Sequence, residues 1–175
     1  MTRTWIALVV VGLTTSAAAN DDDPPAPEQK VETPFDRGKL GVGIYGGSQT
    51  TLGHRYFAIG GAVGYYVLDG VEVGLGALHQ FGDGPSISKL TPSVRYVVQP
   101  LVGRSPVIPY VGVFYNHWFI GDDYADVDTL GTRGGLLYVS GKLILGLGVA
   151  YERIASECVT DCSAVYPDFT ISLSL

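Results

Sequence analysis

Charged residues are scarce in this chain, and most of them are acidic. Only 16% of the 175 residues are Asp, Glu, Lys or Arg, and 11 cations against 17 anions give a formal net charge of −6. Such a composition does not supply the basic face that nucleic-acid binding requires. An apolar content of 46% also excludes a charge-rich disordered chain. The sequence therefore predicts a folded protein that binds no nucleic acid.

The composition of a helical protein is missing as well. The chain has 24 Gly and 11 Tyr but a single Met, whereas helical bundles are built from Ala, Leu, Glu and Lys. No segment after residue 19 has a helical period of apolar residues. These features favour an all-β protein of one domain.

The N-terminal region lacks the properties of a folded domain. Its apolar run, Trp5 to Leu13, is too short to cross a bilayer as a helix. Arg3 precedes this run and three alanines end at Ala19, which is typical of a secretory signal peptide over residues 1–19. Residues 20–37 are acidic and proline-rich without any period, and predict a disordered linker before a folded domain over residues 38–175.

From residue 38 onward the apolar residues recur with a period of two. Leu143, Leu145, Leu147 and Val149, for example, alternate with small residues. This alternation is typical of strands. We expect eight of them, over residues 38–46, 56–67, 71–81, 91–99, 108–119, 134–140, 142–153 and 165–175.

The two faces of these strands differ in size rather than in charge. One face is large and aliphatic, and the other holds Gly, Ala, Ser, Thr and a few charges. Small residues suit the crowded interior of a narrow barrel, and outward aliphatic residues are tolerated only against lipid. The predicted fold is an all-β, eight-stranded antiparallel up-and-down transmembrane β-barrel with its apolar face outward. Its even strand number places both termini, and the acidic linker, on one side, and the short turns expected on that side make it the periplasmic one.

The links between strands and the aromatic residues agree with this topology. Longer polar links at 47–55, 82–90, 120–133 and 154–164 alternate with shorter ones, as in outer-membrane barrels. At Asp69-Gly70, a three-residue loop with Gly70 in the left-handed region and Val67 opposite Val71 would align the aliphatic faces. Aromatic residues near the strand ends predict a girdle at each membrane surface: Phe57, Phe81, Tyr115, Phe119, Tyr151 and Phe169 toward the loops, and Tyr65 and Tyr96 toward the turns.

At this level the chain resembles the small eight-stranded outer-membrane barrels of Gram-negative bacteria, the OmpA-like and OmpX-like group. The features that carry the resemblance are the signal peptide, the strand–turn–strand segment Val63 to Gly76 and the amphipathic segment Tyr166 to Leu175. The resemblance covers residues 38–175. Members of the group commonly end in an aromatic residue, whereas this sequence ends in Leu175. The resemblance implies outer-membrane lipid, periplasmic chaperones and the assembly machinery as partners.

The two cysteines predict a bridge in the last long loop. Cys158 and Cys162 are the only cysteines, and an exported chain favours their disulfide. A hairpin centred on residue 160 would place them opposite each other. The same register would set Glu152 opposite Asp168, where a cation site, a shared proton or plain lumen charge are the alternatives.

The inward phase of the strands carries charges of both signs in equal number. Its predicted lumen charges are Lys39, Glu72, Arg95, Lys142, Glu152 and Asp168. Three cations facing three carboxylates favour a filled barrel over an open pore.

Other motifs in the sequence lack the context that their chemistry requires. The glycines of Gly41-x-Gly43-x-x-Gly46 lie inside a strand rather than before a helix, so they predict no dinucleotide site. His54, His79 and His117 lack the His-x-Ser pair of the outer-membrane lipid A deacylases. The acidic loop from Gly121 to Asp128 lacks the Gly and the closing Glu of a calcium loop.

We therefore expect a monomeric outer-membrane barrel with a structural or surface-interaction role. The sequence predicts no enzyme, no catalytic residue, no metal and no cofactor. A lipid-modifying enzyme that depends on His79 or His117, a narrow channel that depends on Arg95, and a soluble secreted barrel are the alternatives.

Overall fold

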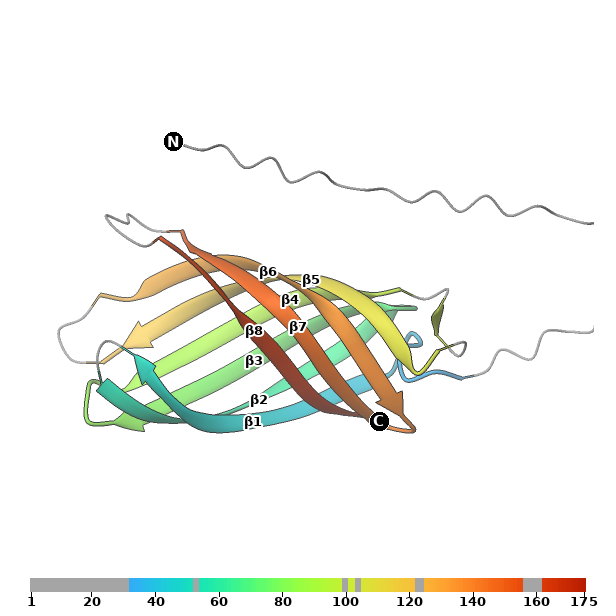
Figure 1. The fold of residues 1–175 in the computed structure, drawn as a ribbon, viewed down its shortest axis with the longest axis horizontal. Helices are drawn as coiled ribbons and strands as arrows, with labels where there is room; N and C mark the ends of the chain where they lie inside the picture. Colours follow the sequence, from blue (N-terminus) through green and yellow to red (C-terminus); the bar gives the residue numbers. More distant parts are fainter. Residues whose placement is uncertain (1–31, 52–53, 99–100, 103–104, 122–124, 156–161) are drawn as a thin grey trace, which may run out of the picture. The chain divides into compact units, whose positions relative to one another are not determined.

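All eight predicted strands are present and form one closed antiparallel barrel. A computed structural model describes residues 32–51, 54–98, 101–102, 105–121, 125–155 and 162–175. Each strand pairs with its sequence neighbours, and β1 closes the barrel against β8 (Figure 1). The strands are β1 (Leu40–Thr51), β2 (His54–Leu68), β3 (Val71–Gly82), β4 (Ile87–Val97), β5 (Val107–Ile120), β6 (Val127–Ser140), β7 (Leu143–Ile154) and β8 (Ser163–Ser174). The predicted fold class is confirmed.

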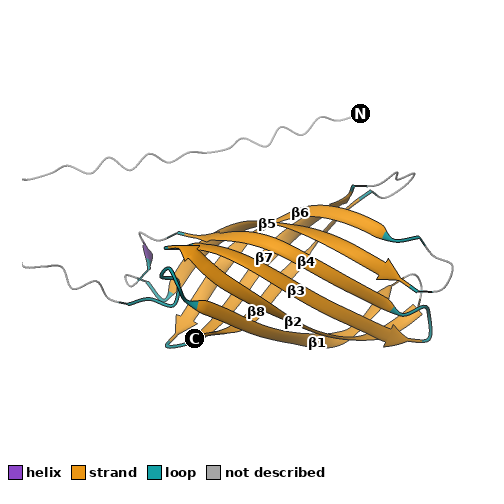
Figure 2. Cartoon of the chain, turned by 180° about the vertical axis from the view of Figure 1, so that it is seen from behind, coloured by secondary structure: helices purple, strands orange, loops and turns teal. Residues whose placement is uncertain are grey.

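The strand connections define two ends of the barrel (Figure 2). The turn-side end carries the links 69–70, 98–106 and 141–142, and the loop-side end carries 52–53, 83–86, 121–126 and 155–162. Residues 32–39 and Leu175 lie at the turn-side end, where the Leu175 amide donates to the Leu40 carbonyl at 2.8 Å. No helix within the described residues has the length and apolarity needed to span a membrane.

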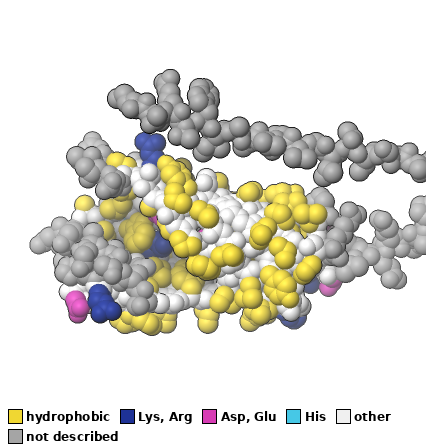
Figure 3. All heavy atoms as spheres, in the orientation of Figure 1, with side chains coloured by type: hydrophobic (Ala, Val, Ile, Leu, Met, Phe, Trp, Pro, Cys, Tyr) yellow, Lys and Arg dark blue, Asp and Glu magenta, His cyan; other side chains and the backbone are white. Residues whose placement is uncertain are grey.

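The aliphatic residues face outward, as the period predicts. Large apolar side chains are exposed on all eight strands (Figure 3). Examples, one from each strand in order, are Ile44, Ile59, Leu75, Val94, Val111, Leu130, Leu147 and Ile171. Such a surface would be unfavourable against water and is suited to hydrocarbon.

Strand β6 is twice as long as its sequence pattern indicates. The pattern predicts a strand over residues 134–140, but β6 begins at Val127. In its first half the outward face includes Asp128 and Thr132, and the inward face includes Val127 and Arg133. The apolar alternation is therefore hidden, and pairing with β5 and β7 determines the conformation instead.

The turn between β2 and β3 uses a different register from the predicted one. Gly70 has a φ of 78°, in the left-handed region that glycine favours. However, Leu68 rather than Val67 pairs with Val71, and a bulge follows between Tyr66 and Leu68. The bulge contains the extra residue that the prediction placed in the loop. This residue restores the match between the aliphatic faces of β2 and β3.

The predicted register of the β7–β8 hairpin is wrong by four residues. Tyr151 pairs with Val165, Glu152 with Ala164 and Gly148 with Asp168. Because the shift is an even number, the inward and outward faces stay aligned, and the face pattern alone could not reveal it. Glu152 and Asp168 are therefore not opposite each other.

The turn-side end contains the apolar core of the barrel. Phe35 is fully buried there, with Tyr66, Val97, Ile108, Tyr110, Leu137 and Ile144 around it. The composition predicts disorder through residue 37, but the segment from Glu32 onward folds against the barrel. Hydrogen bonds from Thr33 to the Asp36 carboxylate and from Gly70 N to the Phe35 carbonyl hold it there.

Candidate functional site

The barrel interior above this core holds a polar cavity of about 350 Å³. Charged side chains from β3, β4, β6 and β8 line it: Glu72, Lys89, Arg95, Arg133 and Asp168. Glycines of β1, β2 and β3 supply much of the remaining wall, and their lack of side chains creates the space. This lumen cavity is the candidate site.

Arg95 and Glu72 form a buried ion pair at the bottom of the cavity. The Arg95 Nε donates to Glu72 Oε2 at 3.0 Å, and a terminal guanidinium nitrogen binds the same oxygen. That nitrogen also reaches the Tyr66 hydroxyl at 3.3 Å. Arg95 and Glu72 are cross-strand partners on β4 and β3, so the pairing register itself brings them together.

Glu152 and Asp168 are satisfied by neutral donors rather than by cations. Asn116 donates to Glu152 at 2.7 Å and Tyr166 at 2.7 Å, and Thr129 donates to the same carboxylate. Tyr110 donates its hydroxyl proton to Asp168 at 2.8 Å. The donors come from three strands, β5, β6 and β8, so the network links the barrel across its interior.

Two cations that the sequence analysis did not select also project into the lumen. Lys89 lies with its ammonium 4.7 Å from the centre of the Trp118 ring. Arg133 donates to the Ser93 hydroxyl at 3.3 Å and lies 5.9 Å from the Phe114 ring centre. Both fall in segments that the alternation predicts to be loops, 82–90 and 120–133. Extending the alternation of β4 and β6 toward their loop-side ends would have placed both on the inward phase.

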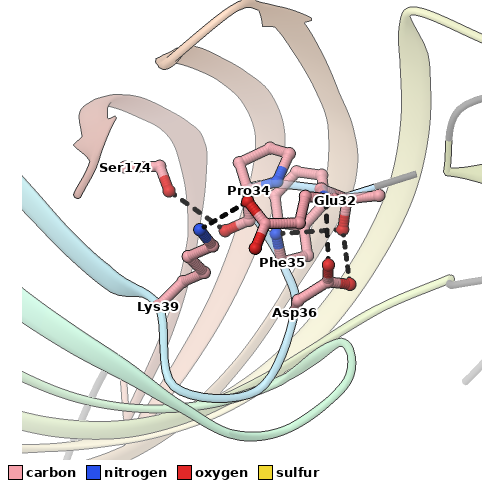
Figure 4. A network of polar contacts seen from close by, with 7 residues as sticks. Glu32, Pro34, Phe35, Asp36, Lys39 and Ser174 are labelled. Carbon is pink, nitrogen blue, oxygen red and sulfur yellow. Dashed lines mark hydrogen bonds and ion pairs between the residues drawn. The ribbon is translucent and has the colours of Figure 1, made fainter. Parts of the chain in front are cut away.

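Lys39 and Lys142 lie at the turn-side end, away from the cavity lining. Lys39 forms an ion pair with Glu32 at 3.4 Å, beside the contact between the Ser174 hydroxyl and the Pro34 carbonyl (Figure 4). Lys142 is exposed in the turn between β6 and β7. Both residues lie just before the first residue of a strand. The sequence alternation extends to these positions, but they lie beyond the paired strands that enclose the lumen.

The outward face near the loop-side end carries two histidine contacts. His79 Nδ1 lies 2.9 Å from the Ser88 hydroxyl, and these residues are cross-strand partners on β3 and β4. His117 Nδ1 lies 2.6 Å from Asp128, and its Nε2 lies 3.7 Å from Asp126. Within the described residues no group of three metal-ligating side chains occurs.

Several predicted features fall on residues outside the described part of the chain. Cys158 lies there, so the disulfide with Cys162 stays a prediction. The signal peptide and most of the acidic linker lie there, as do residues 122–124 of the acidic loop.

Comparison with known proteins supports the fold through structure rather than through sequence. No protein-family model and no curated protein matches the chain. The N-terminal β-barrel domain of OprF from Pseudomonas aeruginosa matches with a TM-score of 0.55 and 14% identity, covering 79% of this chain and 98% of that domain. Neisserial surface protein A matches with a TM-score of 0.50 and 16% identity, covering 78% of this chain and 94% of that protein. The outer membrane protein OprG from Pseudomonas aeruginosa matches with a TM-score of 0.49 and 16% identity, covering 81% and 97%.

These matches identify the architecture. The resemblance to small eight-stranded outer-membrane barrels, predicted from the strand pattern, is confirmed at the level of fold. At such low identities the likeness transfers no ligand, partner or activity.

Proposed function

We propose that this protein is an integral outer-membrane barrel with a structural or surface-interaction role and no catalytic step. The observation that carries the proposal is the ring of exposed aliphatic side chains on all eight strands. In this arrangement the turn-side end and both termini face the periplasm, and the loop-side end faces the cell exterior. The bilayer lipid, the periplasmic chaperones and the assembly machinery are its partners, and the barrel works as a monomer.

Membrane extraction and electrophoresis test the membrane location. We expect the protein to leave the membrane fraction only with detergent, because water does not solvate the aliphatic ring. An unheated sample should migrate differently from a boiled one, since the closed barrel resists unfolding. Release into the aqueous fraction without detergent, with unchanged mobility on boiling, would show a soluble barrel instead.

The contact between His79 and Ser88 favours a second candidate, a lipid-directed esterase. The hydroxyl lies within hydrogen-bond reach of a potential base, on the outward face where an acyl ester could approach. Among the described residues no carboxylate orients the second His79 nitrogen, so the full triad is not formed there. This absence is why we place the esterase second.

Substitution of Ser88 separates the two candidates. If the pair is catalytic, Ser88→Ala abolishes release of fatty acid from outer-membrane lipid, and His79→Gln does the same. Our first proposal expects no release from either the unmodified protein or the variants. Ester cleavage by the unmodified protein that is lost in Ser88→Ala would contradict it.

A further inference from the structure

The seam between β1 and β8 closes over only part of its length. Three residue pairs join these strands, Gly41 with Ser174, Val42 with Leu173 and Gly43 with Ser172. Every other neighbouring pair of strands in the described barrel is joined by at least nine such pairs, as β4 and β5 are. Beyond Gly43, β1 continues to Thr51 without a described partner in β8.

The residues of the open segment explain why the strands separate. Pro167 in β8 has no amide proton to give to a neighbouring strand, and proline within sheets is typical of edge strands. Along the same register Gly46 and Gly47 lie opposite Phe169 and Asp168, next to Pro167, and they supply no side chain to pack. Both strands here are therefore weak partners.

The lumen cavity reaches the outer surface at this seam. Its lining includes inward residues of β8, such as Asp168 and Thr170, together with the outward residues Phe169 and Ile171. Figure 3 shows a hollow on the face that carries β1 and β8, with a Lys or Arg side chain visible inside. Outward residues of the paired strands β2 and β3, Val63 and Leu75, also border the cavity, so the missing β1–β8 pairing and the hollow, rather than the lining alone, locate the opening.

The side chains beside the opening include the most exposed large apolar residues of the described strands. Ile44 on β1 is 79% exposed, and Phe169 on β8 is 69% exposed. In the fully paired wall, by comparison, the outward aliphatic side chains Leu145 and Leu147 are 38% and 60% exposed. The missing pairing thus leaves an apolar rim around a polar cavity.

Two cations in the cavity are not paired with a carboxylate. The lining carries Lys89, Arg95 and Arg133 with Glu72 and Asp168, and Glu152 lies beside it, bound to the lining residues Asn116 and Tyr166, so the charges balance in number. Arg95 is engaged by Glu72, whereas Lys89 and Arg133 have no carboxylate within 4.0 Å among the described residues. The Arg133 Nε is buried and has no hydrogen-bond partner there. These donors are available to a ligand.

We propose that the β1–β8 seam admits an anionic single-chain amphiphile from the membrane into the lumen. Lys89 and Arg133 bind its charged head, and its alkyl chain leaves through the seam between Ile44 and Ile171. The cavity volume falls in the range of small-molecule sites, about 300–1,000 Å³. This inference rests on the proposed membrane location, which the extraction experiment tests separately.

Trp118 provides a built-in reporter, because it contacts Lys89 and is the only tryptophan after residue 19. The probes are 2-bromododecanoate and 12-bromododecanoate, added to the chain from residue 20 in zwitterionic lipid nanodiscs. Bromine quenches tryptophan on contact. We expect the 2-bromo acid to quench at least about five times more strongly than the 12-bromo acid, since its bromine lies beside the head group. Equal quenching by the two acids would overturn the proposed orientation.

Two pairs of introduced cysteines, both on the β1–β8 register, test the entry route. Each pair is made in a protein that also carries Cys158→Ser and Cys162→Ser. The pair Ile44→Cys and Ile171→Cys lies at the first open position and locks the seam when oxidised. The control pair, Val42→Cys and Leu173→Cys, lies in the segment that is already paired. We expect oxidation to reduce quenching only in the first pair, with recovery on reduction. Unchanged quenching in the locked barrel would refute entry through the seam.

Arg133→Gln tests the head-group site without altering the seam. Losing one charge-assisted contact should weaken binding of the 2-bromo acid about tenfold. Heat-modifiable mobility verifies that each variant is folded. Undiminished binding in a folded Arg133→Gln barrel would exclude Arg133 from the site. Failure of all quenching in a protein that needs detergent for extraction would reject the amphiphile site and leave the membrane location intact.

Discussion

Gly41 and Gly64 face each other across β1 and β2, yet only one of them leaves room for a side chain. A methyl group on Gly41 would meet nothing closer than the Gly64 carbonyl at 4.0 Å. A methyl group on Gly64 would overlap the Glu72 carboxylate, which Arg95 holds in place. Two glycines that look alike in the sequence therefore have different roles in the lumen.

This difference predicts unequal costs for two identical substitutions. Gly64→Ala should lower the free energy of unfolding by about 1–3 kcal/mol, because the carboxylate must leave its partner or the strands must separate. Gly41→Ala should change it by less than about 0.5 kcal/mol. Urea unfolding in lipid vesicles measures both. Equal losses would mean that strand propensity, rather than the position of Glu72, sets the cost.

How much of the site the sequence reveals depends on where each charge lies along its strand. Glu72 and Arg95 lie within clear alternating segments, so the period assigns them to the inward face. Lys89 and Arg133 lie where polar residues interrupt the apolar face, and no local pattern indicates a strand there. Their partners, Trp118, Ser93 and Phe114, come from other strands, and one sequence does not specify such contacts.

At the scale of an element, residues 32–39 act as a plug for the turn-side end. Phe35 is fully buried against the barrel core, with none of its surface accessible to solvent. The Arg37 amide donates to Asp69 at 2.8 Å, and the Gly38 amide donates to the Tyr66 carbonyl at 2.8 Å. The lumen cavity is thus blind at this end.

Truncation tests the plug with an internal control. A chain that begins at residue 38 loses Phe35, and by analogy with other buried aromatic residues it should lose about 3–5 kcal/mol of stability. Its turn-side end would also open, so ion conductance in planar bilayers should rise. A chain that begins at residue 32 keeps the plug and should match the longer chain in both measurements. Equal behaviour of the two truncated chains would show that the plug neither stabilises nor seals the barrel.

The strand pattern predicts the elements better than it predicts their ends and their register. The period of two predicts the eight strands, because alternate side chains of each strand face the lipid and the crowded interior. The bulge after Tyr66 and the four-residue shift of the β7–β8 hairpin both preserve this alternation. Any register that keeps the faces aligned satisfies the pattern equally, so loop geometry decides among them. Phe35 escapes prediction for another reason: one apolar residue among prolines and charges has no period.

At the scale of the whole molecule, the orientation of the two faces depends on the surrounding solvent. The aliphatic ring is outside and the charged network inside, the reverse of a water-soluble barrel. The buried ion pair and the hydrogen-bonded carboxylates are tolerated because each carboxylate has donors from other strands. The charged network thereby occupies the interior between the apolar core at the turn-side end and the buried side chains Tyr56 and Ile87 near the loop-side end.

A single arginine, moved along the outward face, tests this orientation. Leu147 lies near the middle of β7 and is 60% exposed, whereas Val165 lies at the loop-side start of β8 and is 69% exposed. In lipid vesicles, Leu147→Arg should cost about 2–4 kcal/mol, because hydrocarbon surrounds that position, while Val165→Arg near the interface should cost about 0–1 kcal/mol. Urea unfolding of the two variants gives the comparison directly. A barrel surrounded by water would tolerate both substitutions alike, since both side chains are already exposed, so equal and small losses would refute the membrane assignment.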